Sequence, residues 1–474
     1  MWQGLFYTKT KMSLIKSISG IRGTIGGKPG DSLSPIDIVK FTSAYATLIK
    51  LKNKGKERYK IVVGRDARIS GEMVESIVCG TLTACGMDVV NCGLASTPTV
   101  EMGVIFEHAD GGIILTASHN PKEWNALKLL NEKGEFFSAE DGERLLSIID
   151  NDGFQYASVD NIGVLTSKDF TAQHIEAVMA HPLVNTSAIY RAGYKVVLDP
   201  INSVGAIVMP KLLAALGVNC VVINSEPNGR FAHNPEPLPE NLTELSAAVI
   251  REEADLGIAV DPDVDRLALI SENGNSFGEE YTLVAVADYV LKHTKGNTVS
   301  NLSSSRALKD ITEAAGGEYF ASAVGEVNVV TEMKRVNAVI GGEGNGGTIV
   351  PELHYGRDAL IGTALFLSYM ATENIPASEL RKRFPVYFSS KNRLELSPEI
   401  DMESIFTATK EKYAQYRITD IDGVKIDFDN ERKWVHLRKS NTEPIIRVYA
   451  EAPSQEEANS AATEVIDYIK NLIG

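Results

Sequence analysis

The apolar and polar positions of the chain repeat one order of elements three times. Each unit opens with a short run of apolar and β-branched residues, which is typical of a buried strand. These opening strands are predicted at residues 59–63, 194–198 and 298–302. A polar cluster that can begin a helix follows each of them. The repeated unit therefore starts as a strand followed by a helix.

Glycine marks the end of the predicted helix in each unit. A glycine just beyond the last turn is a common C-terminal cap, because it adopts left-handed backbone angles without steric cost. The three glycines are Gly86, Gly217 and Gly316. A second apolar strand then closes each unit, at residues 112–115, 257–260 and 338–340. Strands that alternate with helices in this way predict mainly parallel sheets covered on both faces, with ligands at the carboxyl ends of the strands.

The pattern changes after about residue 384. Three runs look like antiparallel strands, at 394–396, 423–426 and 434–437. An amphipathic stretch at 455–472 predicts a closing helix. The C-terminal part is therefore expected to be a separate α+β domain.

Length and charge narrow the class of protein. A chain of 474 residues is too long for one core and suggests several domains. No window holds the ~18 unbroken apolar residues that a membrane helix needs, so no membrane partner is expected. The net charge of −15 also makes nucleic acid an unexpected partner. An anionic substrate would need a locally basic pocket.

The N-terminus and the cysteines indicate a cytoplasmic protein. The first eleven residues lack the apolar stretch of a secretory signal, and regular patterning begins at Met12, which we expect to be the natural start. The four cysteines, at positions 79, 85, 92 and 220, have no Cys-x-x-Cys spacing. They are expected to be reduced thiols in the core rather than zinc ligands or disulfides.

The loop after the first unit's closing strand places a hydroxyl at a strand end. Residues 116–121 read Thr-Ala-Ser-His-Asn-Pro, and their small side chains would leave the Ser118 hydroxyl exposed. Such a serine can accept or donate a phosphoryl group. A turn held by side-chain hydrogen bonds is the alternative interpretation. A hydrolase nucleophile is disfavoured, because Gly-x-Ser-x-Gly is absent and His119 adjoins Ser118.

The corresponding loop of the second unit carries three carboxylates at alternate positions. These are Asp261, Asp263 and Asp265, and Arg266 follows them. At about 4 Å and an effective dielectric constant of about 20, each pair repels by an order of 4 kcal/mol, so a bound cation is expected. Oxygen ligands favour Mg²⁺ over Zn²⁺. A solvated acidic turn is one alternative. An aspartyl phosphatase with Asp261 as nucleophile is another, but it leaves Ser118 and the repeat unexplained.

Two further loops suit a sugar and a phosphate. Residues 341–347 contain five glycines, and Glu343 and Asn345 offer hydrogen-bonding groups to sugar hydroxyls, although a flexible turn would look the same. Residues 438–447 combine arginines with hydroxyl and amide groups, a composition that suits the binding of a phosphate dianion. An ordinary charged turn is the alternative interpretation. The side chains concerned are Arg438, Ser440, Asn441, Thr442 and Arg447.

Together the four loops resemble the active-site loops of the α-D-phosphohexomutase superfamily, in the same order. The motifs are Thr-Ala-Ser-His-Asn-Pro, Asp-x-Asp-x-Asp-Arg, Gly-Glu-x-Asn-Gly and Arg-x-Ser-Asn-Thr-Glu-Pro. Further similarities are Ser-Gly-Ile-Arg-Gly at 19–23, Gly-Arg-Asp at 64–66 and Asn-Ala-Leu-Lys at 125–128. The match runs from Met12 to Gly474. Each motif is ambiguous alone, whereas four in one order are specific.

The resemblance implies four domains around a central cleft: three repeated α/β domains with mixed, mainly parallel sheets, and a C-terminal α+β domain. Their expected ranges are 12–160, 161–272, 273–384 and 385–474. It also implies an intramolecular phosphotransferase that interconverts hexose 6-phosphate and hexose 1-phosphate. A phosphoserine and a hexose 1,6-bisphosphate would be the intermediates. A monomer and a homodimer are both compatible with the sequence.

The resemblance also assigns roles to single residues. The Mg²⁺ ligands would be Ser118, Asp261, Asp263 and Asp265. Arg22 and Arg266 would neutralise charge on the transferring phosphoryl group. Lys128, with His119 nearby, is the candidate general acid and base. Substrate would also be bound by Glu343, Asn345, Arg438, Ser440, Asn441, Thr442 and Arg447.

Two positions depart from the family pattern. Asn441 stands where the family more often has glycine, and Ala126-Leu127 where it more often has Gly-Phe or a similar pair. Asparagine tolerates positive φ, so a tight turn in the phosphate loop remains feasible. The second change leaves Lys128 in place.

The loop sequences look most like the phosphoglucosamine mutase branch. We therefore expect conversion of glucosamine 6-phosphate to glucosamine 1-phosphate, with phosphoglucomutase or phosphomannomutase activity as the alternative. A sugar-phosphate-binding protein without chemistry would have lost Ser118 or the aspartates, and none is lost. A metal-dependent phosphatase would show net release of phosphate.

Overall fold

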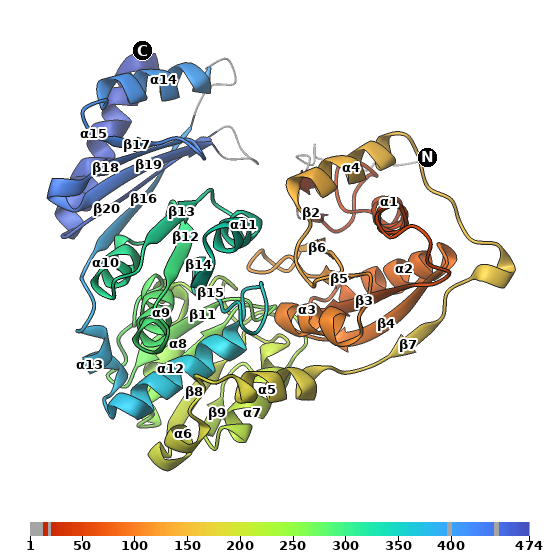
Figure 1. Ribbon diagram of the computed structural model, residues 1–474, viewed down its shortest axis with the longest axis horizontal. Helices are drawn as coiled ribbons and strands as arrows, with labels where there is room; N and C mark the ends of the chain where they lie inside the picture. The colour runs from red at the N-terminus through yellow and green to blue at the C-terminus, as the bar shows by residue number, and fades with distance from the viewer. Residues whose placement is uncertain (1–12, 18–19, 396–400, 440–444, 474) are drawn as a thin grey trace, which may run out of the picture. The chain divides into compact units, whose positions relative to one another are not determined.

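The computed structural model describes residues 13–17, 20–395, 401–439 and 445–473 (Figure 1). The chain forms two compact units. The first runs to Glu279 and also includes Gly347–Ser378, and the second comprises Glu280–Gly346 and the chain from Glu379 onwards. In the described part, no helix combines the length and the apolar character needed to cross a membrane.

A seven-stranded mixed sheet forms the N-terminal part of the first unit, in the order β1-β2-β6-β5-β3-β4-β7. The strands are β1 (Ile15–Ser17), β2 (Gly20–Thr24), β3 (Tyr59–Arg65), β4 (Met87–Leu94), β5 (Gly111–Leu115), β6 (Trp124–Leu130) and β7 (Leu165–Ser167). The run from β5 to β7 is parallel, whereas β6, β2 and β1 are antiparallel. The segment 116–121, here called the Ser118 loop, follows β5.

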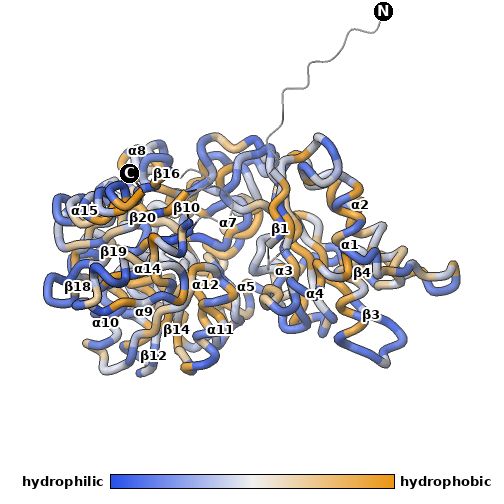
Figure 2. The backbone as a smooth tube through the Cα atoms, turned by 90° about the horizontal axis from the view of Figure 1, so that it is seen from above, coloured by the Kyte–Doolittle hydropathy of each residue, from blue (hydrophilic) through white to orange (hydrophobic). Residues whose placement is uncertain are grey.

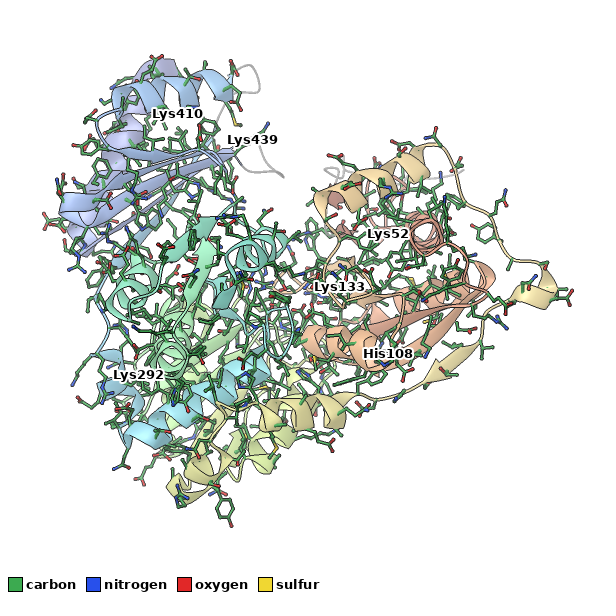
Figure 3. The ribbon with its side chains drawn as sticks, viewed as in Figure 1. Lys52, His108, Lys133, Lys292, Lys410 and Lys439 are labelled. Carbon is green, nitrogen blue, oxygen red and sulfur yellow. The ribbon has the colours of Figure 1, made fainter. Side chains whose placement is uncertain are left out.

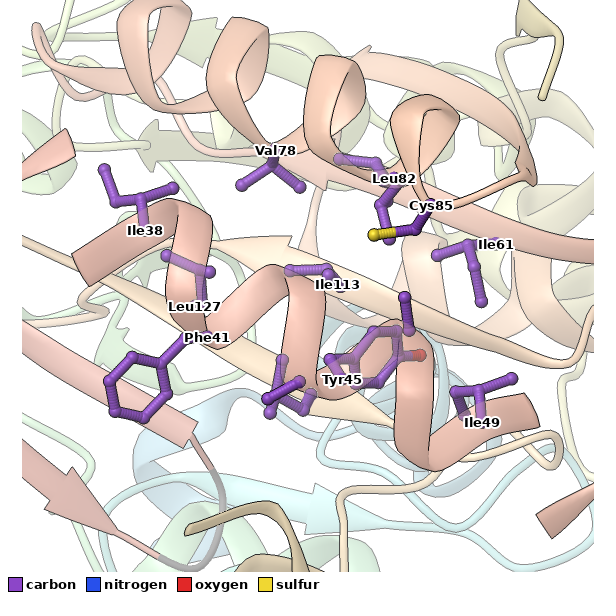
Figure 4. Packing of buried hydrophobic residues seen from close by; sticks show 14 of the residues in the cluster. Ile38, Phe41, Tyr45, Ile49, Ile61, Val78, Leu82, Cys85, Ile113 and Leu127 are labelled. Carbon is purple, nitrogen blue, oxygen red and sulfur yellow. The ribbon is translucent and has the colours of Figure 1, made fainter. Parts of the chain in front are cut away.

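Helices cover both faces of this sheet (Figure 1). They are α1 (Pro35–Lys52), α2 (Gly71–Ala84), α3 (Thr97–Phe106) and α4 (Ala139–Asp150). Side chains alternate along β3, so Ile61 packs with α1 and α2 and Val62 packs with α3. Figure 4 shows the first of these cores around Tyr45. At its rim Lys52, labelled in Figure 3, lies 2.9 Å from Asp141 of α4.

A four-stranded sheet with the order β11-β10-β8-β9 forms the rest of the first unit. The strands are β8 (Lys195–Asp199), β9 (Asn219–Val222), β10 (Leu256–Val260) and β11 (Leu267–Ser271), with the short strand β15 (Gly347–Ile349) in the same unit. The helices are α5 (Thr171–Ala180), α6 (Thr186–Ala192), α7 (Gly205–Ala215), α8 (Thr243–Arg251) and α12 (Ala359–Glu373). Residues 261–266, here called the aspartate loop, join the antiparallel strands β10 and β11.

The second unit contains two sheets. In the first, β12 (Asn297–Asn301) lies parallel to and between β13 (Tyr319–Ser322) and β14 (Ala338–Glu343). Its helices are α9 (Tyr281–His293), α10 (Arg306–Ala314) and α11 (Glu326–Val336). The short helix α13 (Ala377–Arg381) spans the sequence boundary between the units.

The C-terminal sheet of the second unit is antiparallel throughout, in the order β16-β20-β19-β18-β17. Its elements are β16 (Phe388–Glu395), α14 (Met402–Lys412), β17 (Arg417–Thr419), β18 (Val424–Phe428), β19 (Lys433–Lys439), β20 (Ile445–Ala452) and α15 (Gln455–Ile473). The helices α14 and α15 pack on one face, and the polar side chains of the strands lie on the other. Along the chain, Figure 2 shows the apolar stretches of such elements separated by polar segments.

The structure confirms the three repeats and their capping glycines, but each unit has a strand and a helix that the plan lacked, between the glycine and the closing strand. These are β4 and α3, β9 and α8, and β13 and α11. Gly86, Gly217 and Gly316 have φ angles of 77°, 75° and 78°, and each lies two residues after the last residue of its helix. Two predicted boundaries are wrong. β14 runs on to Glu343, so the predicted glycine loop begins as a strand, and β16 begins at Phe388 rather than 394 because its polar residues hid the strand pattern. All four cysteines are free thiols, buried or half-buried.

Candidate active site

Ser118 has a strained backbone and a defined hydroxyl partner. Its φ of 49° lies in the left-handed region, which is uncommon for a residue other than glycine. The hydroxyl donates to Oδ2 of Asp261 at 2.6 Å and lies 3.4 Å from Nδ1 of His119. The backbone N–H donates to the Thr116 hydroxyl at 2.9 Å. Such strain persists only where surrounding contacts hold the loop.

A buried arginine supplies those contacts. Arg68 is 1 % exposed and donates to three backbone carbonyls around the serine. The carbonyls belong to Ser118, Pro121 and Trp124. Nε of Arg68 also donates to Asp66 at 2.9 Å, and Asp66 accepts from the Thr116 hydroxyl at 2.6 Å. The sequence analysis missed Arg68, although it lies two residues beyond the Gly-Arg-Asp motif.

The three aspartates of the aspartate loop converge as the sequence predicts. Their side chains are fully buried, and one oxygen of each lies within 4.8 Å of the others. Asp261 accepts the backbone N–H groups of Asp265 and Arg266 at 3.1 Å each. Val264, between Asp263 and Asp265, has a φ of 64°, a rare angle for a β-branched residue.

The donor set of this cluster fits a hard divalent cation. Within the described residues, Oδ1 of Asp263 and Oδ1 of Asp265 are buried and accept no hydrogen bond. Burial, then the charges of Asp265 and Asp263, raise the pKa of Asp261 well above its usual value, a cost that a cation would remove. Buried carboxylate oxygens with free lone pairs are what Mg²⁺ requires.

Three side chains from outside the aspartate loop form hydrogen bonds or ion pairs with its carboxylates. Lys128 of β6 lies 2.7 Å from Asp263 and 3.4 Å from Asp265. The hydroxyl of Thr97, at the start of α3, donates to Asp263 at 2.6 Å, and Arg357 donates to Asp265 at 2.6 Å. Burial opposes the charge of Lys128, but the two carboxylates outweigh it and raise its pKa. Thr97 and Arg357 carry no motif that the sequence analysis could recognise.

Three arginines lie near the Ser118 loop and affect its histidine. Arg22 donates to Asn120 of the Ser118 loop at 3.2 Å, and Arg266 lies 3.3 Å from Glu236. Burial first, and then Arg266, Arg22 and Arg357, lower the pKa of His119 well below its usual value. This part of the first unit is therefore suited to a group with more negative charge than a serine hydroxyl.

In the second unit Glu343 has a fixed position. It is 6 % exposed at the end of β14, and its Oε1 accepts from Asn301 at 2.9 Å and from the Gly325 N–H at 3.2 Å. The next N–H, of Gly344, donates to Ser304 at 3.0 Å. Asn345 is half-buried two residues further on. Both predicted sugar-binding residues thus lie at one strand end.

Three arginines lie side by side on the C-terminal sheet. Arg447 of β20 is the direct partner of Arg438 on β19 and of Arg393 on β16. Like charges directly opposite each other destabilise a sheet unless an anion compensates them. Arg438 precedes Lys439, which Figure 3 labels at the end of β19. The predicted residues Ser440, Asn441 and Thr442 lie outside the described residues, and the sequence analysis missed Arg393.

Four family models match the chain in order. They are described as phosphoglucomutase/phosphomannomutase α/β/α domain I at residues 14–156, domain II at 172–274, domain III at 278–387, and the C-terminal domain at 399–468. The model for domain III spans part of both compact units.

Curated proteins and a solved structure agree with these matches. A phosphoglucomutase/phosphomannomutase of Thermococcus kodakarensis is 37% identical over 92% of this chain and 95% of its own length. A probable phosphoglucosamine mutase of Pyrococcus abyssi is 34% identical over 96% and 97%. A phosphoglucomutase/phosphomannomutase family protein of Burkholderia thailandensis has the same fold, with a TM-score of 0.81, 23% identity and 97% of both chains covered. The predicted four-domain fold class is thus confirmed, and the chain belongs to the phosphoglucomutase/phosphomannomutase family of the α-D-phosphohexomutase superfamily.

Proposed function

We propose that this phosphohexomutase transfers a phosphoryl group between the 6 and 1 oxygens of a hexose through Ser118, with glucosamine phosphate as its preferred substrate. The observation that carries the proposal is the contact of 2.6 Å between the Ser118 hydroxyl and Asp261. This contact joins Ser118, whose backbone is strained, to Asp261. Asp261 belongs to a cluster of three carboxylates whose oxygens fit a cation. A nucleophile beside such a cluster suits phosphoryl transfer.

Mg²⁺ bound by Asp261, Asp263, Asp265 and phosphorylated Ser118 would neutralise charge on the transferring group. The chain's own residues do the rest. As the bond between phosphorus and the serine oxygen breaks, a sugar hydroxyl forms the new bond to phosphorus. The hydroxyl proton passes to a base and the serine oxygen is reprotonated. Our candidates for these proton transfers are His119 and Lys128.

Charge on the phosphoryl group would be balanced by Arg22 and Arg266, with Arg357 as an addition from the structure. A second transfer, from the other oxygen of the sugar bisphosphate back to Ser118, completes the isomerisation. The bisphosphate must therefore bind in two poses. We assign the sugar hydroxyls to Glu343 and Asn345, because each offers polar groups near a strand end.

The phosphate that is not transferred is assigned to the arginine row and the residues that follow it. Guanidinium groups form charge-assisted, forked hydrogen bonds with phosphate oxygens. The residues in this role are Arg438, Ser440, Asn441, Thr442 and Arg447, with Arg393 as an addition.

Support for glucosamine phosphate comes from the loop sequences, from the name of the Pyrococcus relative, and from charge. The buried carboxylate of Glu343 would pair with the ammonium of an amino sugar more strongly than with a neutral hydroxyl. The alternative, a phosphoglucomutase/phosphomannomutase, is favoured by the name of the more similar Thermococcus relative.

The test compares kcat/KM of phosphorylated, Mg²⁺-loaded protein on glucosamine 6-phosphate, glucose 1-phosphate and mannose 1-phosphate. We expect an advantage of roughly tenfold for the amino sugar, and loss of activity on all three in Ser118→Ala. A preference for glucose or mannose phosphate would overturn the substrate and keep the mechanism. Full turnover by Ser118→Ala, or net release of phosphate, would overturn the mechanism.

A further inference from the structure

A buried cluster of charged side chains lies beside the aspartate loop and has no part in the proposed chemistry. Its members are Glu101 of α3, His174 of α5, His354, and Asp358, the N-cap of α12. All belong to the first unit, and none is more than 5 % exposed. Burying four ionisable groups is costly unless each is paired, so their arrangement needs a reason.

The arrangement requires a charged imidazole at His354. Its Nδ1 lies 3.3 Å from Oε2 of Glu101, and its Nε2 lies 3.3 Å from Oδ2 of Asp358. Because each nitrogen faces a carboxylate, both carry a proton. Burial opposes this charge, but the hydrogen bonds to Asp358 and Glu101 outweigh it and raise the pKa to about 10.

The second imidazole, of His174, has a hydrogen-bonding partner for each ring nitrogen. Nε2 of His174 donates to Oδ2 of Asp358 at 2.9 Å, and its Nδ1 can accept from the Thr99 hydroxyl at 3.1 Å. The other oxygen of Asp358 caps α12 by accepting the Leu360 N–H at 2.7 Å. In this arrangement the imidazolium of His354 bridges the carboxylates of Glu101 and Asp358.

Both bridged carboxylates are attached to groups that hold the aspartate loop. Asp358 adjoins Arg357, which donates to Asp265, and the N–H of Ala359 donates to the carbonyl of Val264 at 3.2 Å. Glu101 lies one helical turn after Thr97, on the same face of α3. Thr97 donates to Asp263 through its hydroxyl at 2.6 Å and its N–H at 2.8 Å.

We infer that His354 is a positioning residue that sets the affinity of the aspartate loop for a divalent metal ion. By joining Glu101 to Asp358, it fixes Thr97 and Arg357 against the two sides of a loop that contains a strained valine. The inference rests on the proposed metal-binding role of the aspartates. It adds a residue that touches neither metal nor substrate.

The test is His354→Gln, which keeps polar groups but removes the charge. We expect the dissociation constant for Mn²⁺, measured by electron paramagnetic resonance, and the half-activating concentration of Mg²⁺ to rise about fivefold or more. The value of kcat at saturating Mg²⁺ should stay within about threefold of wild type. The matched control is His181→Gln, another buried histidine of the first unit, which contacts Glu352 and should leave metal affinity unchanged.

A double variant that restores the net charge of the cluster distinguishes a positioning role of His354 from general destabilisation of the fold. His354→Gln leaves Glu101 and Asp358 without the cation between them, and adding Glu101→Gln removes one of the two charges. The double variant should regain at least half of the lost Mn²⁺ affinity on a logarithmic scale. Glu101→Gln alone serves as the second variant if His354→Gln does not fold, and it should weaken Mn²⁺ binding about twofold to fivefold.

Unchanged Mn²⁺ affinity in a folded His354→Gln or Glu101→Gln protein would overturn the inference. So would a stoichiometric transition metal that is lost with His354, because the cluster would then be a metal site. Failure of the proposed function is a separate result. A wild-type protein that binds Mn²⁺ and isomerises no hexose phosphate would overturn the function, whereas the Mn²⁺ measurements would still decide the role of His354.

Discussion

At the scale of residues, the candidate site contains two residues whose backbone has left-handed φ angles, which residues other than glycine rarely adopt. Ser118 and Val264 have φ angles of 49° and 64° and occupy the two loops that meet at Asp261. Each such angle costs of order 1–3 kcal/mol, so contacts elsewhere must hold it. For Ser118 the holding group is Arg68. Its guanidinium reaches three carbonyls and Asp66 at once, which no other side chain can do.

Replacing Arg68 by lysine should therefore lower activity without removing a reacting group. An ammonium on a flexible stem cannot satisfy three carbonyls and a carboxylate together, so buried acceptors would lose partners. We expect Arg68→Lys to lower kcat at least tenfold and the free energy of unfolding by about 2–4 kcal/mol, measured by kinetics and urea denaturation.

The control for this prediction is Arg65→Lys. Arg65 is a neighbouring, largely buried arginine whose guanidinium pairs with Glu75 and donates to the carbonyl of Asp66. Among the described residues, its side-chain hydrogen bonds and ion pairs do not involve the Ser118 loop. Its replacement should leave kcat within about twofold. A fully active Arg68→Lys enzyme would mean that the serine needs no such support.

At the scale of elements, the sequence predicted those strands and helices whose patterning is local. β3, β8 and β10 are buried apolar runs, and the helices before Gly86 and Gly217 end where glycine caps them. β16 was largely missed, because Ser-Ser-Lys-Asn-Arg is a polar edge strand whose partner β20 lies far along the chain. Alternation of apolar and polar residues reveals a strand that buries one face. β16 buries few of its side chains, so its sequence shows little of this alternation.

The candidate site follows the same rule. Ser118 and the three aspartates were predictable because each group is contiguous and its chemistry is local. Thr97 and Arg357 reach the aspartates only through tertiary contacts, and no local signal marks them. In the second unit, Arg393 joins the row of arginines only through strand register. Sequence reasoning could name the residues assigned to the chemistry, and Lys128 among those that contact the aspartates, but not Thr97 or Arg357.

Strand register makes Arg393 testable. Because Arg393 is paired directly with Arg447, it adds a third guanidinium to the row assigned to the non-reacting phosphate. Arg393→Gln should raise KM for the hexose phosphate about threefold to tenfold and change kcat little, since binding and not bond-making is affected. The effect should shrink as salt increases.

Lys391 provides the comparison for this variant. It lies two residues earlier on the same face of β16, opposite Tyr449 rather than an arginine. Lys391→Gln should therefore leave KM within about twofold. Equal effects of the two variants would indicate general charge attraction, and the specific role of the row would then be wrong.

At the scale of the whole molecule, the compact units do not coincide with the matched domains. The model for domain III spans 278–387, yet α12 belongs to the first unit, where it packs on α5 and α6. Asp358 and Arg357 enter the first unit with this helix. The third repeat therefore contributes its last helix to the unit that carries the serine and the aspartates, and its strand end with Glu343 to the other unit.

This division predicts that a divalent metal stabilises one unit selectively. A ligand that binds only the folded state stabilises it by about 2.7 kcal/mol at a concentration 100 times its dissociation constant. The measurement is calorimetry in Mg²⁺ and in EDTA. Mg²⁺ should raise the melting temperature of the transition that belongs to the first unit, because the three aspartates lie there. Asp261→Asn should remove the shift, whereas Asp420→Asn, at a surface carboxylate of the second unit, should keep it. A metal-dependent shift that survives Asp261→Asn, or one that affects both units equally, would place the dominant metal site away from the aspartate loop.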